Sequence, residues 1–244
     1  MTETKYYEKK QDGVLFARAS KDLQDPASHG ALERQWNFKG KSGSTWGWVQ
    51  SSIEGLIESA FVSDFGDDVY FNIGLQQPNG EVAVFKNRLY TDTFQLVQAF
   101  RNIDLDKPLR IEAFVNSKGA YTNKDGISVV PASIKILQDG KQVSWVFNRN
   151  KEEKRWCGPD GVDDMPEIQR KSSMGRVKYD KSEQQDFMEK EIEVFIGRVG
   201  EIEESRKASR PKTSNEIAAN QKVETAIDTD VSEMVTAGST GEPF

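Results

Sequence analysis

The chain has 244 residues, of which 36% are hydrophobic and 30% charged, and its formal net charge is −6. No run approaches about 18 consecutive apolar residues, which excludes a membrane-spanning helix. The single cysteine, Cys157, and the single histidine, His29, exclude an intrachain disulfide and argue against a zinc site or a histidine-based catalytic group. Because the N-terminus has no apolar signal-peptide segment, a cytoplasmic location is expected.

The first predicted elements lie in an N-terminal extension, residues 1–45. Strand-forming residues over 13–20 and 32–38 predict two added strands in this extension. A longer run of strand formers follows over 46–65, and its glycines permit sharp bending. We expect this run to be one long bent strand that begins the central domain.

A β-hairpin is predicted next. Apolar and polar residues alternate over 69–75, which is the period of a strand with one buried face. Residues 77–80 read Gln-Pro-Asn-Gly, a composition typical of a tight turn. A second strand is therefore expected over 82–90.

The period of the apolar residues then changes. Over 94–100 it is helical and predicts a short helix, after which Lys107-Pro108 prevents continuation. Strand alternation returns over 109–115. A polar loop is expected over 116–126 and a last strand over 127–137.

This order of elements is one long bent strand, two hairpin strands, a short helix and two more hairpin strands. It is the order of the five-stranded OB-fold barrel, in which a helix separates the third and fourth strands. We therefore expect a mainly β protein whose OB-fold core spans residues 46–147, with additional flanking strands. The exposed strand face of such a barrel commonly binds oligonucleotides or oligosaccharides.

An extension over residues 148–207 follows the expected core. No secondary structure is predicted for 148–179. Asp180 and Glu183 fit a capping box, and the apolar residues after them recur at spacings of four and three, so a C-terminal helix is expected over about 181–206. A helix of this kind packs on its own domain, or it serves in dimerisation or partner binding. The first use is the commoner, and a homodimer or larger homo-oligomer stays open.

The last segment, residues 208–244, differs in composition from the rest. Its only aromatic residue is Phe244 and its large apolar residues are few, so it cannot bury enough surface to offset the entropy of ordering. Three basic and six acidic residues place half of the net charge there. We predict a disordered acidic tail and a body of nearly balanced charge, which can still contain a basic groove.

Single-stranded nucleic acid is held by aromatic faces that stack on bases and by cations that follow the phosphates. Aromatic residues on the polar faces of strands, close to Lys or Arg, are therefore candidate contacts. These candidates are Trp46, Trp48, Tyr70, Lys86, Arg88, Tyr90, Arg110, Phe114, Lys118, Tyr121, Lys124, Trp145, Arg149 and Trp156.

Each candidate also has an explanation without nucleic acid. A tryptophan in a strand, such as Trp46 or Trp48, is as often part of a core as a stacking platform. Alternating charges on a strand are usually a solvated face. Tyr121, in a polar loop, has no evident place in a core. The convergence of all these residues on one OB-like order is the argument for a nucleic-acid site.

Two acidic clusters could bind a divalent cation, but neither has the spacing of a calcium loop. They are Asp64, Asp67 and Asp68, and Asp160, Asp163 and Asp164. Phosphate-binding glycine loops and dinucleotide-binding glycine motifs are absent from the sequence. We therefore expect no metal and no cofactor.

The region from about residue 46 to 143 resembles the bacterial and bacteriophage single-stranded DNA-binding proteins. The strand order carries this resemblance, together with the helix and low-complexity tail that lead to Glu242-Pro243-Phe244. Members of that family end in an acidic tail whose Pro-Phe or Phe tip recruits replication, recombination and repair proteins. The resemblance implies that Pro243 and Phe244 fill an apolar pocket on such a partner, while Glu242 and the terminal carboxylate meet its basic rim. The long segments flanking the core fit a phage-encoded member best.

The expected function is non-enzymatic: coating and protection of single-stranded DNA with little sequence preference, in a bacterial cell or phage-infected host. One alternative is an OB-type module that binds protein or RNA within a larger assembly. A metal-dependent nuclease is a third hypothesis. No membrane partner is expected.

Overall fold

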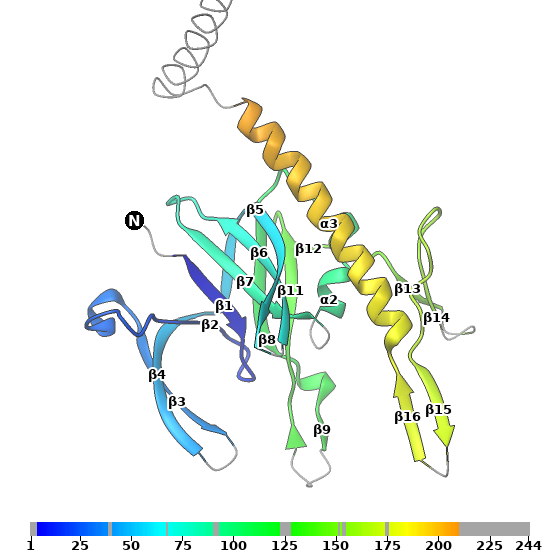
Figure 1. Ribbon diagram of the computed structural model, residues 1–244, viewed down its shortest axis with the longest axis horizontal. Helices are drawn as coiled ribbons and strands as arrows, with labels where there is room; N and C mark the ends of the chain where they lie inside the picture. The colour runs from blue at the N-terminus through cyan, green and yellow to red at the C-terminus, as the bar shows by residue number, and fades with distance from the viewer. Residues whose placement is uncertain are drawn as a thin grey trace, which may run out of the picture. The chain divides into compact units, whose positions relative to one another are not determined.

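The computed structural model describes residues 4–38, 41–66, 68–89, 93–122, 128–150, 152, 155–173 and 176–209. The chain divides into two compact units between Glu203 and Glu204, and the sites discussed below lie in the first. The fold is mainly β, as the sequence predicts (Figure 1). Within the described ranges, no helix is long and apolar enough to span a membrane.

Ten strands form one sheet in the order β12–β11–β8–β5–β6–β7–β1–β2–β4–β3. Their bounds are β1 (Lys5–Lys9), β2 (Leu15–Arg18), β3 (Leu32–Phe38), β4 (Lys41–Gln50), β5 (Ser52–Phe65), β6 (Asp68–Gln76), β7 (Val82–Arg88), β8 (Leu109–Val115), β11 (Ala132–Gln138) and β12 (Lys141–Gln142). Three small hairpins pair β9 (Tyr121–Thr122) with β10 (Ser128–Val129), β13 (Asn148–Asn150) with β14 (Arg155–Cys157), and β15 (Gln169–Ser173) with β16 (Arg176–Asp180). Among the described residues, the structure contains helices α2 (Phe94–Val97) and α3 (Ser182–Ser209) and the 3₁₀ turns η1 (Pro26–His29), η2 (Phe100–Asn102) and η3 (Ser117–Gly119).

The centre of the sheet has the pairing that the sequence predicts. Strand β5 pairs antiparallel with β6 and with β8, β6 pairs with β7, and β8 pairs with β11. Both hairpin predictions are therefore confirmed. The register of β5 against β6 shifts between Ile57 and Ser59. A Cβ on Gly74 would lie 2.3 Å from Ser59 Oγ, so a larger residue beside this irregularity would require the Ser59 hydroxyl to rotate away.

The N-terminal strand β1 occupies the place beside β7. It pairs parallel with β7 and antiparallel with β2. The C-terminal end of β1 also contacts β11, the central strand farthest from β7 in the sheet order. There Lys9 Nζ donates a hydrogen bond to Ala132 O at 3.2 Å. A Cβ on Gly13, where φ is +75°, would lie 2.6 Å from Val115 N. No pairing among the described residues closes the five central strands into the expected barrel. The edge of β7 that would close it is bonded to β1.

Two predicted strands are wrong in their bounds. The run over 46–65 is two strands, β4 and β5, which pair with different neighbours. Trp46 and Trp48 consequently belong to the N-terminal strands β2–β4–β3. The run over 127–137 is interrupted at Pro131, which has no N–H to donate to a ladder.

The predicted helices form with changed lengths. The helix expected over 94–100 is only α2, followed by the 3₁₀ turn η2. Helix α3 begins after Asp180, whose Oδ1 accepts bonds from the Ser182 backbone N–H at 3.1 Å and from its hydroxyl at 2.7 Å. It continues through Ser209, so the first two residues of the predicted tail are helical. Residues 210–244 lie outside the described residues.

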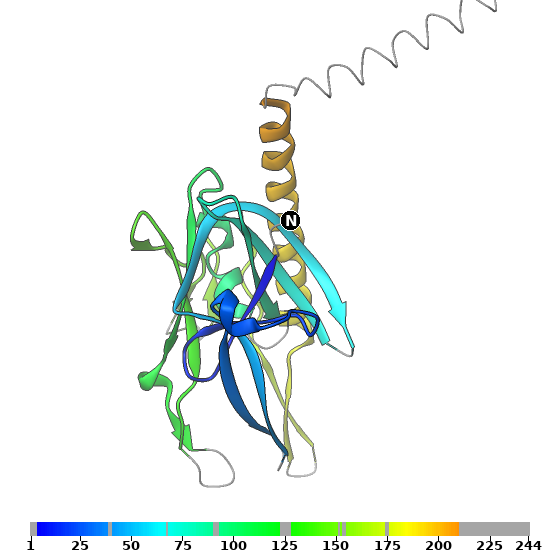
Figure 2. The same cartoon turned by 90° about the vertical axis from the view of Figure 1, so that its left-hand side faces the viewer.

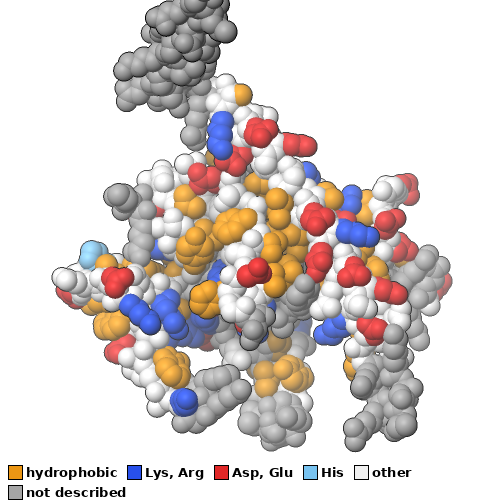
Figure 3. Space-filling view, in the orientation of Figure 1, with side chains coloured by type: hydrophobic (Ala, Val, Ile, Leu, Met, Phe, Trp, Pro, Cys, Tyr) orange, Lys and Arg blue, Asp and Glu red, His pale blue; other side chains and the backbone are white. Residues whose placement is uncertain are grey.

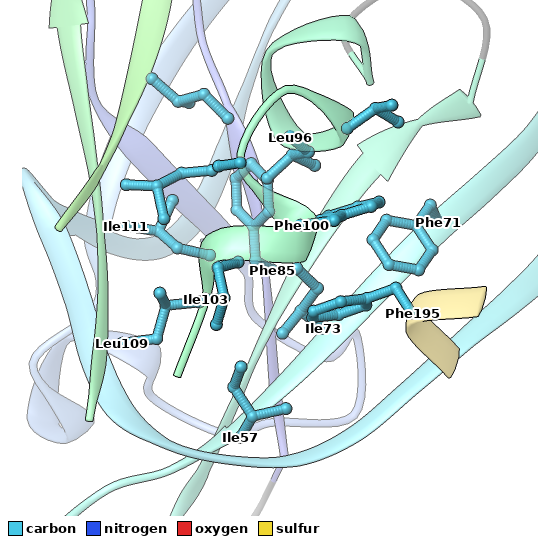
Figure 4. Close-up of a cluster of buried hydrophobic side chains, with 14 of the residues drawn as sticks. Ile57, Phe71, Ile73, Phe85, Leu96, Phe100, Ile103, Leu109, Ile111 and Phe195 are labelled. Atoms are coloured by element: carbon cyan, nitrogen blue, oxygen red, sulfur yellow. The ribbon is translucent and has the colours of Figure 1, made fainter. Parts of the chain in front are cut away.

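Helix α3 packs on its own domain, which confirms the commoner of its two predicted uses. Its buried stripe contains Phe195, whose ring stacks on Phe100 with centroids 4.3 Å apart and meets Phe71 edge-on at 6.2 Å (Figure 4). Arg101 makes a bidentate pair with buried Glu191, with N···O distances of 2.8 and 2.7 Å. These contacts anchor α3 to η2 and to β6.

Candidate nucleic-acid interface

A groove crosses the N-terminal part of the sheet. It consists of two adjoining hollows, of about 590 and 410 Å³, which share Lys10, Phe16 and Arg18. Strands β1, β2 and β4 form its floor together with β7, the tip of the β5–β6 hairpin borders one part, and β3 borders the other. Figure 2 shows the β3–β4 hairpin and the end of the β5–β6 hairpin as two separate projections from the sheet. We call this feature the groove below.

Aromatic side chains line the groove along its length. They are Tyr6, Phe16, Trp36, Trp48, Phe65 and Tyr70. Phe65 is 72% exposed, Tyr6 49% and Trp36 43%, so these rings are not part of the core. Trp48 is half-buried, and its indole N–H donates to His29 O at 3.1 Å, which fixes the plane of the ring. Partly exposed, oriented rings of this kind can accept a stacked planar ligand.

Lysine ammonium groups lie against several of these rings. Lys86 Nζ is 3.9 Å from the centroid of the Tyr70 ring and 4.8 Å from that of Phe65. Lys5 Nζ is 4.8 Å from the Trp48 ring. A base that moves the ammonium aside, or that stacks on the opposite face of such a ring, would have a cation within reach of its phosphate.

The groove is locally cationic although the whole chain carries −6. Its lining cations are Lys5, Lys10, Arg18, Arg34 and Lys86, and its lining carboxylates are Glu8 and Asp64. The space-filling view shows Lys and Arg gathered where β1, β2 and β4 lie in Figure 1 (Figure 3). Two of these cations also pair with carboxylates outside the lining, Lys5 with Glu81 at 3.9 Å and Arg34 with Asp12 at 2.7 Å. The remaining excess of positive charge is modest, and its sign suits a polyanionic ligand.

Among the described residues, Glu8 is the one carboxylate of the groove lining that forms ion pairs with other lining residues. Its Oε2 is 2.9 Å from Lys10 Nζ and its Oε1 is 3.5 Å from Lys86 Nζ. Desolvation by burial raises the pKa of Glu8, but the bonds and charges of Lys10 and Lys86 outweigh it and hold the pKa below its usual value. Glu8 is therefore an anion at neutral pH.

Comparison of the chain with protein-family models, with curated proteins and with solved structures found no match. The chemistry of the groove is therefore the basis on which a function can be assigned.

The structure brings three of the predicted contacts together in the groove: Trp48, Tyr70 and Lys86. Arg88 stands opposite Tyr70 in the β6–β7 register and pairs with Asp68, at the border of the groove. Trp46, 36% exposed on β4, does not line it.

Other predicted contacts lie elsewhere on the sheet. Arg110 and Phe114 share a face of β8, where Arg110 pairs with Glu112 at 3.4 Å and Lys135 Nζ lies 4.7 Å from the Phe114 ring. Lys118 is exposed in η3, and Tyr121 is 56% exposed in β9. Neither pair lines the groove.

A third cluster gathers the predicted residues that follow the central strands. Trp145 meets Trp156 edge-on at 6.3 Å, and the Arg149 guanidinium is 5.4 Å from the Trp156 ring. Trp156 and Arg149 line a separate hollow of about 360 Å³ beside the start of α3. Arg149 pairs there with Glu167 at 2.6 Å.

Some predicted sites are not described. Tyr90, Lys124 and the tip Glu242-Pro243-Phe244 lie outside the described residues. Of the acidic clusters, Asp67 is likewise outside. Where side chains are described, no group of three or more His, Cys, Asp or Glu is arranged to hold a metal ion.

Sequence reasoning missed the N-terminal contribution to the groove. Lys5, Tyr6, Lys10, Phe16 and Arg18 all line it, yet none was among the predicted contacts. The signal was present in the segment Lys-Tyr-Tyr-Glu-Lys-Lys over residues 5–10, which mixes aromatic and basic residues. Its importance depends on the parallel pairing of β1 with β7, a long-range contact that local patterns do not reveal.

Proposed function

We propose that this protein binds single-stranded DNA along the groove, with little sequence preference. The observation that carries the proposal is the row of partly exposed rings with cations beside them, above all Trp48 with Lys5 and Tyr70 with Lys86. Each stacked base contributes roughly 1–3 kcal/mol, and every base offers a face for stacking. Binding by stacking and phosphate contact is consequently tolerant of sequence.

The proposed fold is an OB-type barrel built from β5, β6, β7, β8 and β11, with β1 inserted in its seam. The antiparallel pairings of these strands and the position of α2 between β7 and β8 support it. The bond from Lys9 to Ala132 and the close approach of Gly13 to Val115 support a seam in which β1 connects the two ends. The groove would then lie on the side of the barrel where β1 and β2 continue the sheet beyond β7.

The proposed role is non-enzymatic coating and protection of single strands during replication, recombination and repair. It follows from the resemblance of residues 46–143 to the bacterial and phage single-stranded DNA-binding proteins. Recruitment of partner proteins through Glu242, Pro243 and Phe244 belongs to the same proposal. Its setting would be a bacterial cell or a phage-infected host.

The proposal is tested by fluorescence anisotropy of labelled oligo-dT with the wild type and with Tyr70→Leu. Tyr70→Leu removes a stacking face and one partner of Lys86, and it is expected to weaken binding at least fivefold. Tyr121→Leu, a ring outside the groove, is the matched control and is expected to retain wild-type affinity. Equal losses in both variants, or no binding by the wild type, would refute the groove as the site.

The second candidate is an OB-type module that binds protein or RNA in a larger assembly. The exposed apolar side chains Leu32, Trp36 and Val49 on the β3–β4 hairpin favour it. Anisotropy with oligo-U of the same length distinguishes RNA from DNA. A protein that ignores both oligonucleotides would favour the protein-binding alternative.

A further inference from the structure

Glu8 lies inside a groove whose other features suit a polyanion. Its two carboxylate oxygens engage two different lysines, Lys10 at 2.9 Å and Lys86 at 3.5 Å. The other lining carboxylate, Asp64, is exposed on the β5–β6 hairpin and has no ion pair among the described residues. The two acids therefore carry the same charge but differ in whether they hold cations.

A phosphate that binds Lys10 or Lys86 would lie close to the Glu8 carboxylate, which already offsets part of the charge of both lysines. The carboxylate and the phosphate carry like charges, which repel at close range. Glu8 thus lowers the contribution of phosphate contacts to binding. Stacking on Trp48 does not involve the lysines that Glu8 holds, because the cation beside that ring is Lys5, at 4.8 Å. Lys86 lies against the rings of Tyr70 and Phe65, at 3.9 and 4.8 Å from their centroids.

We propose that Glu8 is a specificity-determining residue, which weakens phosphate attraction so that strands with unstacked bases are bound in preference to duplex DNA. The inference rests on the proposed function. In a duplex the bases are stacked on one another and cannot reach the rings of the groove. A duplex can therefore bind only through its phosphates, and Glu8 penalises that mode of binding most.

The size of the effect follows from counterion release. Each phosphate contact contributes about 0.9 to the salt slope of a duplex and about 0.7 to that of a single strand. Freeing Lys10 and Lys86 by Glu8→Gln would steepen the slope by up to about 1.8 for a duplex and 1.4 for oligo-dT. The slope therefore steepens by about 0.4 more for the duplex than for oligo-dT. Between 1 M and about 50 mM salt, this difference reduces the ratio of oligo-dT affinity to duplex affinity about threefold.

The experiment measures dissociation constants of oligo-dT and of a duplex of equal length over a salt series. It compares the wild type with Glu8→Gln and with the control Asp64→Asn, which removes the same charge but frees no lysine. Glu8→Gln is expected to tighten both complexes, steepen both slopes and narrow the preference. Asp64→Asn is expected to leave the slopes and the preference close to wild type.

Equal slopes and preferences in Glu8→Gln and Asp64→Asn would overturn the inference while leaving the proposed function intact. A wild type that does not bind oligo-dT would overturn the proposed function and the inference with it.

If Glu8→Gln does not fold, a comparison of Lys10→Gln with Arg18→Gln tests the inference instead. Lys10 is already neutralised, whereas Arg18 has no ion pair among the described residues, so Lys10→Gln is expected to weaken oligo-dT binding less. Equal losses would overturn the inference.

Discussion

Replacement of Trp48 by leucine is the mutation that most directly perturbs the groove. Leucine keeps an apolar side chain in the position but removes the planar face on which a base would stack. It also removes the indole bond to His29 O at 3.1 Å and the Lys5 contact at 4.8 Å. The expected loss is that of one stacked base, roughly 1–3 kcal/mol, or about 5- to 150-fold in affinity for oligo-dT.

The assay is fluorescence anisotropy of labelled oligo-dT at fixed salt, with thermal unfolding as a check of the fold. The lost hydrogen bond is exposed and contributes about 1 kcal/mol at most, but the half-buried indole also packs against the core. Thermal unfolding therefore separates a loss of stability from the loss of the stacking face. Trp145→Leu is the matched control, because Trp145 is 47% exposed but does not line the groove. Wild-type affinity in Trp48→Leu, or an equal loss in Trp145→Leu, would refute the assignment of Trp48 as a stacking platform.

Three further predictions concern stability. Glu191→Ala should lower the free energy of unfolding by about 2 kcal/mol. This is less than the roughly 3–5 kcal/mol for breaking a fully buried pair, because the Arg101 side chain is 35% exposed and can reach water; an unchanged urea midpoint would contradict this. Gln98 is fully buried, and its side-chain amide has no hydrogen-bond partner among the described residues, so Gln98→Leu should raise the free energy of unfolding by about 1 kcal/mol; a lower melting temperature would refute it. Because the folded-state pKa of Glu8 is lowered, its stabilising contribution is present above the unfolded pKa of about 4.3 and is lost as pH falls through the folded value. The stability difference between wild type and Glu8→Gln should therefore shrink from pH 6 to pH 3, and a constant difference would contradict the ion-pair account.

The hairpins of the fold could be predicted because their signals are local. Alternation over 69–75 and the Asn79-Gly80 turn specify β6 and β7 within about twenty residues of chain. The break between β4 and β5 could not be predicted, because strand formers continue across Ser51 without a turn signal. The two strands are distinguished by their neighbours in the sheet: β4 pairs with β2 and β3, whereas β5 pairs with β6 and β8.

The candidate site could be predicted only in part for the same reason. Trp48, Tyr70 and Lys86 were recognised by residue type and strand face. Lys5 and Phe16, which line the same groove, come from strands β1 and β2, and these strands join the sheet through the parallel pairing of β1 with β7. Residue type also placed Trp145 and Arg149 among the predicted contacts, and the fold separates them into another cluster.

The central claim is that the groove binds single strands by stacking and phosphate contact together. Quenching of intrinsic tryptophan fluorescence by oligo-dT, titrated at low and at high salt, tests it most directly, since Trp48 and Trp36 both line the groove. Strong, saturable quenching at low salt that weakens steeply at high salt is the predicted result. A flat titration at low salt would contradict the claim.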